Sequence, residues 1–129
     1  MGNGPEEILE LWLKHVNEMK VDDIVKLYDD GCTLLPTFSP KSMRSPQEIR
    51  EYFEQLSTRE DMSVELHSGT VSTAVISESK YIIMGIYSFH FNVNEAQLTF
   101  PSRFTFILDT SRSKPILHHH SSQIPRALT

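Results

Sequence analysis

Three consecutive histidines near the end of the chain, His118, His119 and His120, are the side chains best suited to chemistry. They lie in an apolar segment with the pattern of a strand, and successive side chains of a strand point to opposite faces of its sheet. His118, His120 and Ser122 therefore share one face. His119 lies on the other, so the pattern predicts imidazole groups on both sides of the sheet.

Arg103 belongs to the strand predicted just before these histidines. If the connecting hairpin turns on an even number of residues, Arg103 shares the face of His118 and His120. We expect these three side chains to form the anion-binding wall of a pocket. A buried guanidinium needs an anionic partner. That partner is either a protein acid, such as Asp29 or Asp30, or the carboxylate of a bound ligand, which the planar fork of arginine suits.

The two imidazoles on one face have other possible roles. Residues two apart on a strand stand ~6.5–7 Å apart on the same side, so His118 and His120 could chelate zinc with a third ligand. The neighbouring sequence offers no convincing carboxylate or thiolate, and we predict neither a metal nor a cofactor. Structural hydrogen bonds in the pocket wall remain an alternative to ligand binding.

Two aromatic residues carry polar groups that a cavity could use. Trp12 and Tyr28 follow or adjoin apolar helical stripes, where most aromatic side chains belong to the core. We include both as pocket candidates. The predicted ligand-binding residues are thus Trp12, Tyr28, Arg103, His118, His120 and Ser122. The sequence contains no complete catalytic motif, and no catalytic residue is assigned.

The first part of the chain predicts three helices. The first begins at Pro5, which fits a first helical position. A second, short helix is predicted from Asp22 to Tyr28 and is expected to end at Gly31 in a left-handed conformation. The third opens with a capping box at residues 45–48, a serine and a glutamate three positions apart.

The period of the apolar residues then changes to that of strands. A short strand is predicted over residues 32–35, and longer ones over 64–76, 80–91, 98–108 and 116–124. Helices followed by an antiparallel meander indicate an α+β fold. The two strands over 80–108 have apolar residues on both faces, and the helices can cover only one of them. A second copy is the simplest cover for the other, so we predict a homodimer or a larger ring.

Composition bounds the remaining possibilities. The 129 residues form one domain, residues 1–129. A net charge of −5 argues against a nucleic-acid partner. The longest apolar run, residues 81–87, is far below the ~20 residues that span a bilayer, so no membrane partner is expected. The single cysteine, Cys32, cannot form an intrachain disulfide, which favours a reducing, cytoplasmic location.

Four short motifs resemble a known family. They are Asp30-Gly31-Cys32-Thr33, the helical segment 50–56, Ser102-Arg103-Phe104 and His118-His119-His120-Ser121. Together they resemble the nuclear transport factor 2-like superfamily, and most closely the association (hub) domain of calcium/calmodulin-dependent protein kinase II and its stand-alone bacterial relatives. The resemblance implies a cone-shaped, curved antiparallel sheet wrapped around three N-terminal helices. It also implies a pocket between sheet and helices and assembly through the open sheet face.

The resemblance adds functional expectations. Hub domains line their pocket with arginines, of which only Arg103 falls on a matching position here. The leading prediction is a self-associating domain that binds a small polar or anionic organic ligand. The superfamily also contains ketosteroid isomerases and SnoaL-like cyclases, so an enzyme that uses a pocket histidine is the alternative. A purely structural association domain for a protein partner is a third possibility.

Overall fold

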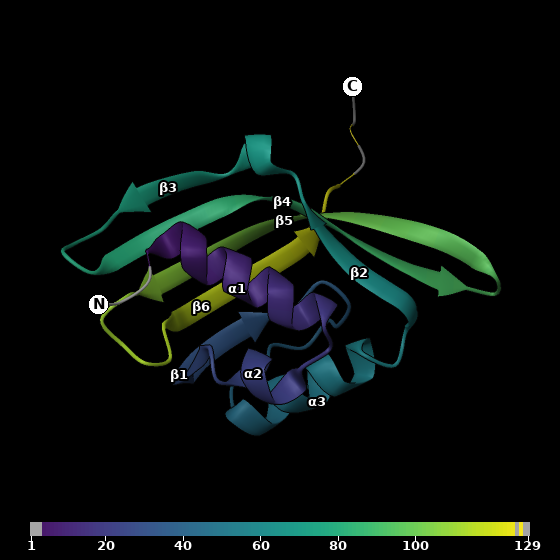
Figure 1. Cartoon of the computed structure of the whole chain (residues 1–129), viewed down its shortest axis with the longest axis horizontal. Helices are drawn as coiled ribbons and strands as arrows, with labels where there is room; N and C mark the ends of the chain where they lie inside the picture. The colour runs from purple at the N-terminus through teal and green to yellow at the C-terminus, as the bar shows by residue number, and fades with distance from the viewer. Residues whose placement is uncertain (1–3, 126, 128–129) are drawn as a thin grey trace.

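A computed structural model describes residues 4–125 and 127 (Figure 1). The helical elements are α1 (Pro5–Asn17), α2 (Val21–Val25), α3 (Pro46–Leu56) and the 3₁₀ turn η1 (Ser68–Thr70). The strands are β1 (Tyr28–Leu35), β2 (Glu60–Leu66), β3 (Ser72–Val75), β4 (Lys80–Val93), β5 (Ala96–Asp109) and β6 (Ile116–Gln123). The predicted α+β class is confirmed. Within the described residues, no helix is both long enough and apolar enough to cross a lipid bilayer.

Helix α1 begins where Pro5 supplies the fixed φ of a first helical residue. Ile8, Trp12 and Val16 recur at helical spacing and are buried. The indole of Trp12 stacks on the Tyr87 ring of β4, with ring centroids 5.4 Å apart. The apolar stripe of α1 therefore packs directly on the sheet.

Helix α3 has the cap that the sequence predicts. The Oγ atom of Ser45 accepts a hydrogen bond from the Glu48 N–H at 3.2 Å, which satisfies one of the free N–H groups of the first turn. Ile49, Phe53 and Leu56 form the buried face of the helix. The opposite side of α3 stays open to solvent and to the pocket described below.

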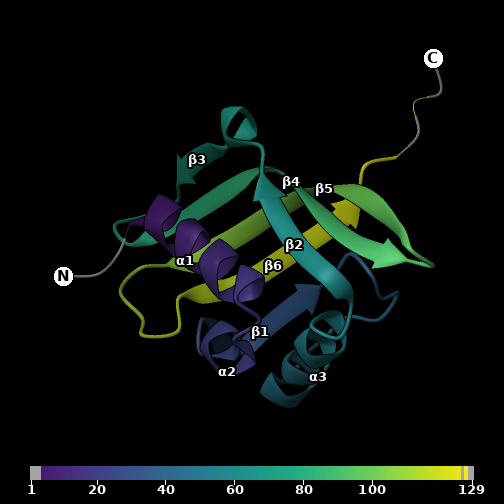
Figure 2. The ribbon, with the colours of Figure 1, turned by 45° about the vertical axis from the view of Figure 1, so that its right-hand side comes forward.

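The sheet runs in the order β1-β6-β5-β4-β2, and β3 also pairs with β4. β1 pairs with β6 in parallel, whereas the other neighbours are antiparallel. The sheet is therefore mixed, not wholly antiparallel as expected. Both views show α1, α2 and α3 on one side of a curved sheet (Figures 1 and 2).

The second helix is shorter than predicted. It ends at Val25, and Tyr28 to Gly31 open strand β1 instead. No glycine in the described chain has a positive φ, so the left-handed conformation expected at Gly31 is wrong. The reason is tertiary: the Tyr28 hydroxyl is anchored in the core by Trp12 and His119, which outweighs local helix propensity.

Strand side chains alternate between two faces. We call the face covered by the helices the inner face; it includes Tyr87, Phe104 and His119, all of which are buried. We call the opposite face the outer face; it includes Ile86 and Arg103, which are paired in register across β4 and β5.

Candidate functional site

The predicted ligand-binding residues divide between the two faces. Arg103 lies opposite Ser122, and His120 and His118 follow at alternate positions of β6, so these four share one face as expected. That face is the outer one. Arg103, His120 and Ser122 are exposed and His118 is half-buried. The expectation that they line the interior of the cone is therefore wrong, while a role in ligand binding stays a prediction.

The interior position is taken by His119, which pairs in register with Phe106 on the inner face. Its ring stacks on Phe106 with centroids 3.9 Å apart. The acids considered as partners of Arg103 are also engaged elsewhere. Asp29 pairs with Arg112 at 2.9 Å, and Asp30 pairs with Lys114 at 2.7 Å.

The other two predicted residues, Trp12 and Tyr28, do lie inside the cone, where they join a chain of hydrogen bonds. The Trp12 Nε1–H donates to the Tyr28 hydroxyl at 3.0 Å. The Tyr28 hydroxyl contacts His119 Nδ1 at 2.8 Å, and His119 Nε2 contacts the Tyr87 hydroxyl at 3.0 Å. These residues come from α1, β1, β4 and β6, so the chain ties the helical layer to the sheet.

The chain of hydrogen bonds has one consistent direction. An indole N–H can only donate, so Tyr28 is left to donate its own proton to His119 Nδ1. At the other end, Tyr87 donates to Ser121 Oγ at 2.7 Å and therefore accepts from His119 Nε2–H. His119 is thus assigned as the neutral Nε2–H tautomer. Every donor of the imidazole and of the two phenols has an acceptor.

Burial keeps these groups neutral. Desolvation lowers the pKa of His119 well below its ordinary value, and it raises the pKa values of Tyr28 and Tyr87 above theirs. His119 has no free nitrogen to offer a substrate. Its chemistry in this structure is to fix the core rather than to transfer protons.

The chain of hydrogen bonds also fixes a loop. Ser121 Oγ is hydrogen-bonded to Thr37 Oγ1, in the segment 36–44 that connects β1 to α3. The next residue, Phe38, packs its ring edge-on against Phe89 and Phe100, with centroids 5.1 and 5.2 Å away. The segment is therefore held against the open end of the sheet.

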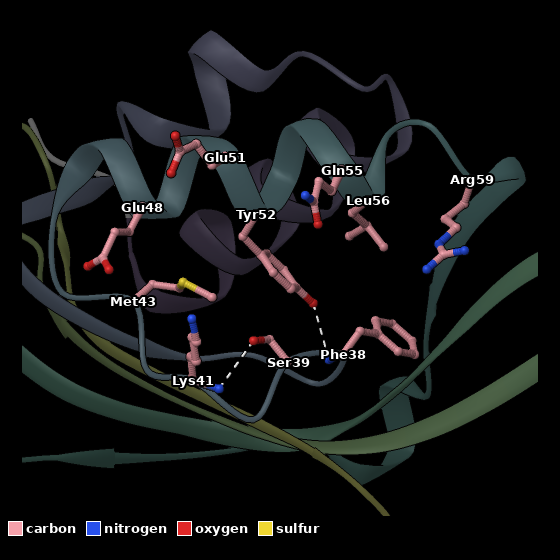
Figure 3. Close-up of a pocket in the computed structure, with 10 residues that line it drawn as sticks. All are labelled: Phe38, Ser39, Lys41, Met43, Glu48, Glu51, Tyr52, Gln55, Leu56 and Arg59. Atoms are coloured by element: carbon pink, nitrogen blue, oxygen red, sulfur yellow. Dashed lines mark hydrogen bonds between the residues drawn. The ribbon is translucent and has the colours of Figure 1, made fainter.

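A pocket of about 450 Å³ lies between this segment and α3 (Figure 3). Its apolar wall consists of Phe38, Met43, Tyr52 and Leu56. Its polar rim consists of Ser39, Lys41, Glu48, Glu51, Gln55 and Arg59. The volume falls within the ~300–1,000 Å³ typical of small-molecule sites. Six of the ten lining residues are polar or charged, so the pocket is more polar than most such sites.

None of the six predicted ligand residues lines this pocket. In the sequence, Tyr52 has helical spacing with Ile49 and Leu56, which is typical of a core position, and residues 36–44 are mostly polar. Two signals were available: Phe38 is a large aromatic residue in a polar loop, and Arg59 directly follows a helix with an aromatic face. Neither signal shows which surfaces face each other, because that depends on how the loop folds back.

No three His, Cys, Asp or Glu side chains among the described residues come together in a way that could hold a metal ion. Cys32 is buried, and desolvation raises the pKa of its thiol to about 12, so it is a poor nucleophile.

No protein-family model matches the sequence, and no curated protein matches it. Solved structures share its architecture. A candidate calcium/calmodulin dependent protein kinase II association domain from Xanthomonas campestris has a TM-score of 0.84 at 22% identity, over 95% of this chain and 86% of that one. A ketosteroid isomerase-like protein from Erwinia carotovora atroseptica has a TM-score of 0.73 at 13% identity, over 94% of both chains.

A third solved structure has a similar architecture. It is a nuclear transport factor 2-like protein with a cystatin-like fold from Novosphingobium aromaticivorans, with a TM-score of 0.76 at 7% identity, over 95% of this chain and 80% of that one. The chain therefore has the nuclear transport factor 2-like fold, as the sequence motifs predict. Because this fold hosts unrelated activities and the identities are low, function has to be argued from the residues themselves.

Proposed function

We propose that this chain is a self-associating domain that binds a small polar or anionic organic molecule in the pocket between α3 and residues 36–44. The pocket itself supports the binding part: it joins an aromatic wall, formed by Phe38 and Tyr52, to a charged rim that includes Lys41 and Arg59. Among the described residues, neither Lys41 nor Arg59 forms an ion pair within 4 Å. The rim carboxylates Glu48 and Glu51 accept hydrogen bonds from Arg44 N–H and Gln47 Nε2. Arg59 beside the aromatic wall therefore favours an amphipathic anion.

The outer face supports self-association. Ile82, Ile86 and Ile107 are partly exposed there, and Met84 is 37% exposed. These apolar side chains lie on adjacent strands, so they form a continuous surface that a second copy would bury. The similarity to a candidate association domain also supports a second copy of this chain as the partner.

Light scattering on two variants tests the assembly. We expect the unmodified chain to give at least twice the mass of one chain, and Ile86→Glu to give a folded monomer because it places a charge in the apolar surface. Val75→Glu is the matched control, since Val75 is 72% exposed and pairs with Tyr81, which places its side chain on the opposite face of the sheet from Ile86. A monomeric unmodified chain at micromolar concentration would overturn the proposal.

A fragment screen by thermal shift tests the binding. Gln55→Trp adds bulk to the rim of the pocket and should abolish any stabilisation by fragments. Gln47→Trp is the control, because Gln47 is an exposed residue of the same helix outside the pocket lining. If no fragment binds, a purely structural association domain becomes the better description.

A histidine-dependent enzyme is less well supported. Among the described residues that line the pocket, none is a histidine. His119 is enclosed in the core with both ring nitrogens hydrogen-bonded, and His118 and His120 belong to the outer face. A cytoplasmic location remains our prediction from the single, unpaired cysteine.

A further inference from the structure

The pocket geometry also suggests a chemical class of ligand, an inference that rests on the function proposed above. We propose that the pocket binds a small aromatic carboxylate. Its ring packs against Phe38 and Tyr52, and its carboxylate accepts hydrogen bonds from Arg59 and from the Tyr52 hydroxyl.

Arg59 is held beside the pocket in the absence of a ligand. It follows the C-terminal end of α3, and its guanidinium lies over the Phe91 ring, 5.4 Å from the centroid. This cation–π contact limits the side chain to one region without consuming its N–H donors. Figure 3 shows the guanidinium turned toward the Phe38 side of the pocket. The planar fork matches a carboxylate better than any other anion-binding side chain does.

Tyr52 supplies a second donor. Its hydroxyl oxygen accepts from the Phe38 N–H at 3.4 Å, and its own proton has no acceptor among the described residues. Burial raises the pKa of this phenol, so the proton is retained at neutral pH. The hydroxyl points between α3 and the segment below it, in the space that a ligand would fill (Figure 3).

The carboxylates of the rim do not compete for Arg59. Glu48 accepts from the Arg44 N–H at 2.8 Å and from Ser45 Oγ at 3.5 Å, as part of the helix cap. Glu51 accepts from Gln47 Nε2 at 3.3 Å. Glu48 belongs to the first turn of α3 and Glu51 to its middle, and both lie away from Arg59 (Figure 3). The pocket is therefore polarised, with its anion-binding end at Arg59.

The body of the ligand is inferred from the wall. Phe38 already packs edge-on against three rings of the sheet, and the Tyr52 ring packs edge-on against Phe53 at 5.2 Å. A flat ring would extend this aromatic cluster in the offset or edge-on geometries that such rings prefer. Met43, whose thioether adapts to irregular shapes, completes the apolar surface.

Calorimetric titration with phenylacetate and its neutral isostere phenylacetamide tests the inference. We expect phenylacetate to bind at least about tenfold more tightly than the amide, because only the acid forms charge-assisted hydrogen bonds. Arg59→Gln should remove this preference, and Tyr52→Phe should weaken acid binding by about threefold to tenfold. Arg44→Gln makes the same charge change outside the pocket lining and should leave both affinities unchanged. Circular dichroism checks that each variant is folded.

The possible failures are distinguishable. Equal affinity for acid and amide, with both lost in Gln55→Trp, would overturn the carboxylate class and leave the pocket function standing. If Arg59→Gln and Arg44→Gln weakened phenylacetate binding equally, the preference for the acid would come from net charge alone. Arg59 would then not belong to the site. Absence of binding by the acid, the amide and every fragment of the screen would overturn both this inference and the proposed pocket function.

Discussion

On the inner face of the sheet His119 is 2% exposed and both of its ring nitrogens are hydrogen-bonded, whereas its neighbour His120 is exposed on the outer face. The inner face surrounds its histidine with Trp12, Tyr28 and Tyr87, all buried. The outer face places its histidines among partly exposed aliphatic residues and beside Arg103. Identical side chains, one residue apart, therefore have opposite environments.

The comparison shows that polarity does not decide which face is buried. A histidine is tolerated in the core when partners reach it from elsewhere in the chain. Tyr28 and Tyr87 do so from positions 91 and 32 residues away in sequence. Without those phenols, the cost of leaving imidazole groups unpaired would favour the opposite arrangement. The outer face has no such partners for His120 among the described residues, and His120 stays exposed there.

Replacing His119 or His120 by leucine should have very different effects on stability. His119→Leu leaves the hydroxyl of Tyr28 without its acceptor and that of Tyr87 without its donor. We expect the free energy of unfolding to fall by about 2–4 kcal/mol, because each buried unpaired group costs about 1–3 kcal/mol. His120→Leu should change it by less than about 0.5 kcal/mol, as exposed substitutions usually do.

Chemical denaturation at one low protein concentration measures both variants under the same association state. His119→Asn offers a partial rescue, because the amide keeps one donor group and one acceptor near the two phenols. Similar small losses in His119→Leu and His120→Leu would mean that the hydrogen-bond chain contributes little to stability.

The stability of the fold should also depend on pH through His119. Burial holds the pKa of His119 well below its ordinary value, so the folded chain keeps this imidazole neutral while the unfolded chain takes up a proton below about pH 6.5. The unfolded state then binds more protons, and the free energy of unfolding falls as the pH is lowered from about 7 to 5. One such group contributes a slope of up to about 1.4 kcal/mol per pH unit.

His118 acts in the same direction but less strongly. Partial burial and the neighbouring His120 lower its pKa, yet the side chain is only half-buried. The contribution of His119 is therefore measured by comparing two proteins, the unmodified chain and His119→Gln. Denaturation between pH 5 and 7 gives the free energy of unfolding of each. The variant should show the flatter pH dependence. An unchanged slope would assign the acid sensitivity to the outer histidines.

Much of the fold was predictable from the sequence, because it depends on helix caps and on the period of the apolar residues, which are local patterns. Pro5, the Ser45 cap and the change from helical to strand period predicted most elements and the α+β class. The sequence also predicted that Arg103 shares a face with His118 and His120, since alternation along a strand is strict.

The candidate site was less predictable, for physical reasons. Alternation says which residues share a face but not which face the helices cover. The buried face is determined by the hydrogen bonds of His119 with Tyr28 and Tyr87, and these three residues come together only in the folded chain. The pocket residues Phe38 and Arg59 come from a loop and from the end of a helix. Their proximity depends on how residues 36–44 fold back, and Thr37 is held there by a hydrogen bond to Ser121 that no local pattern encodes.

The smallest expected effect is that of Arg103→Ala, and it tests the assignment of this residue to the outer face. Arg103 is exposed and forms no ion pair within 4 Å in the described chain. Its removal should change the free energy of unfolding by less than about 0.5 kcal/mol. Phenylacetate affinity should be unchanged, because the α3 pocket lies on the other side of the sheet.

The effect on association follows from charge. If two copies pair through their outer faces, their Arg103 side chains enter one interface. Glu65, an acid of that face, already contacts His90 at 3.2 Å. Removing two like charges should leave dimer dissociation unchanged or tighten the dimer by a few fold, most clearly at low salt where screening is weak. Sedimentation at two salt concentrations measures this. If Arg103→Ala instead abolished phenylacetate binding while the assembly stayed intact, Arg103 would return to the ligand site that the sequence predicts.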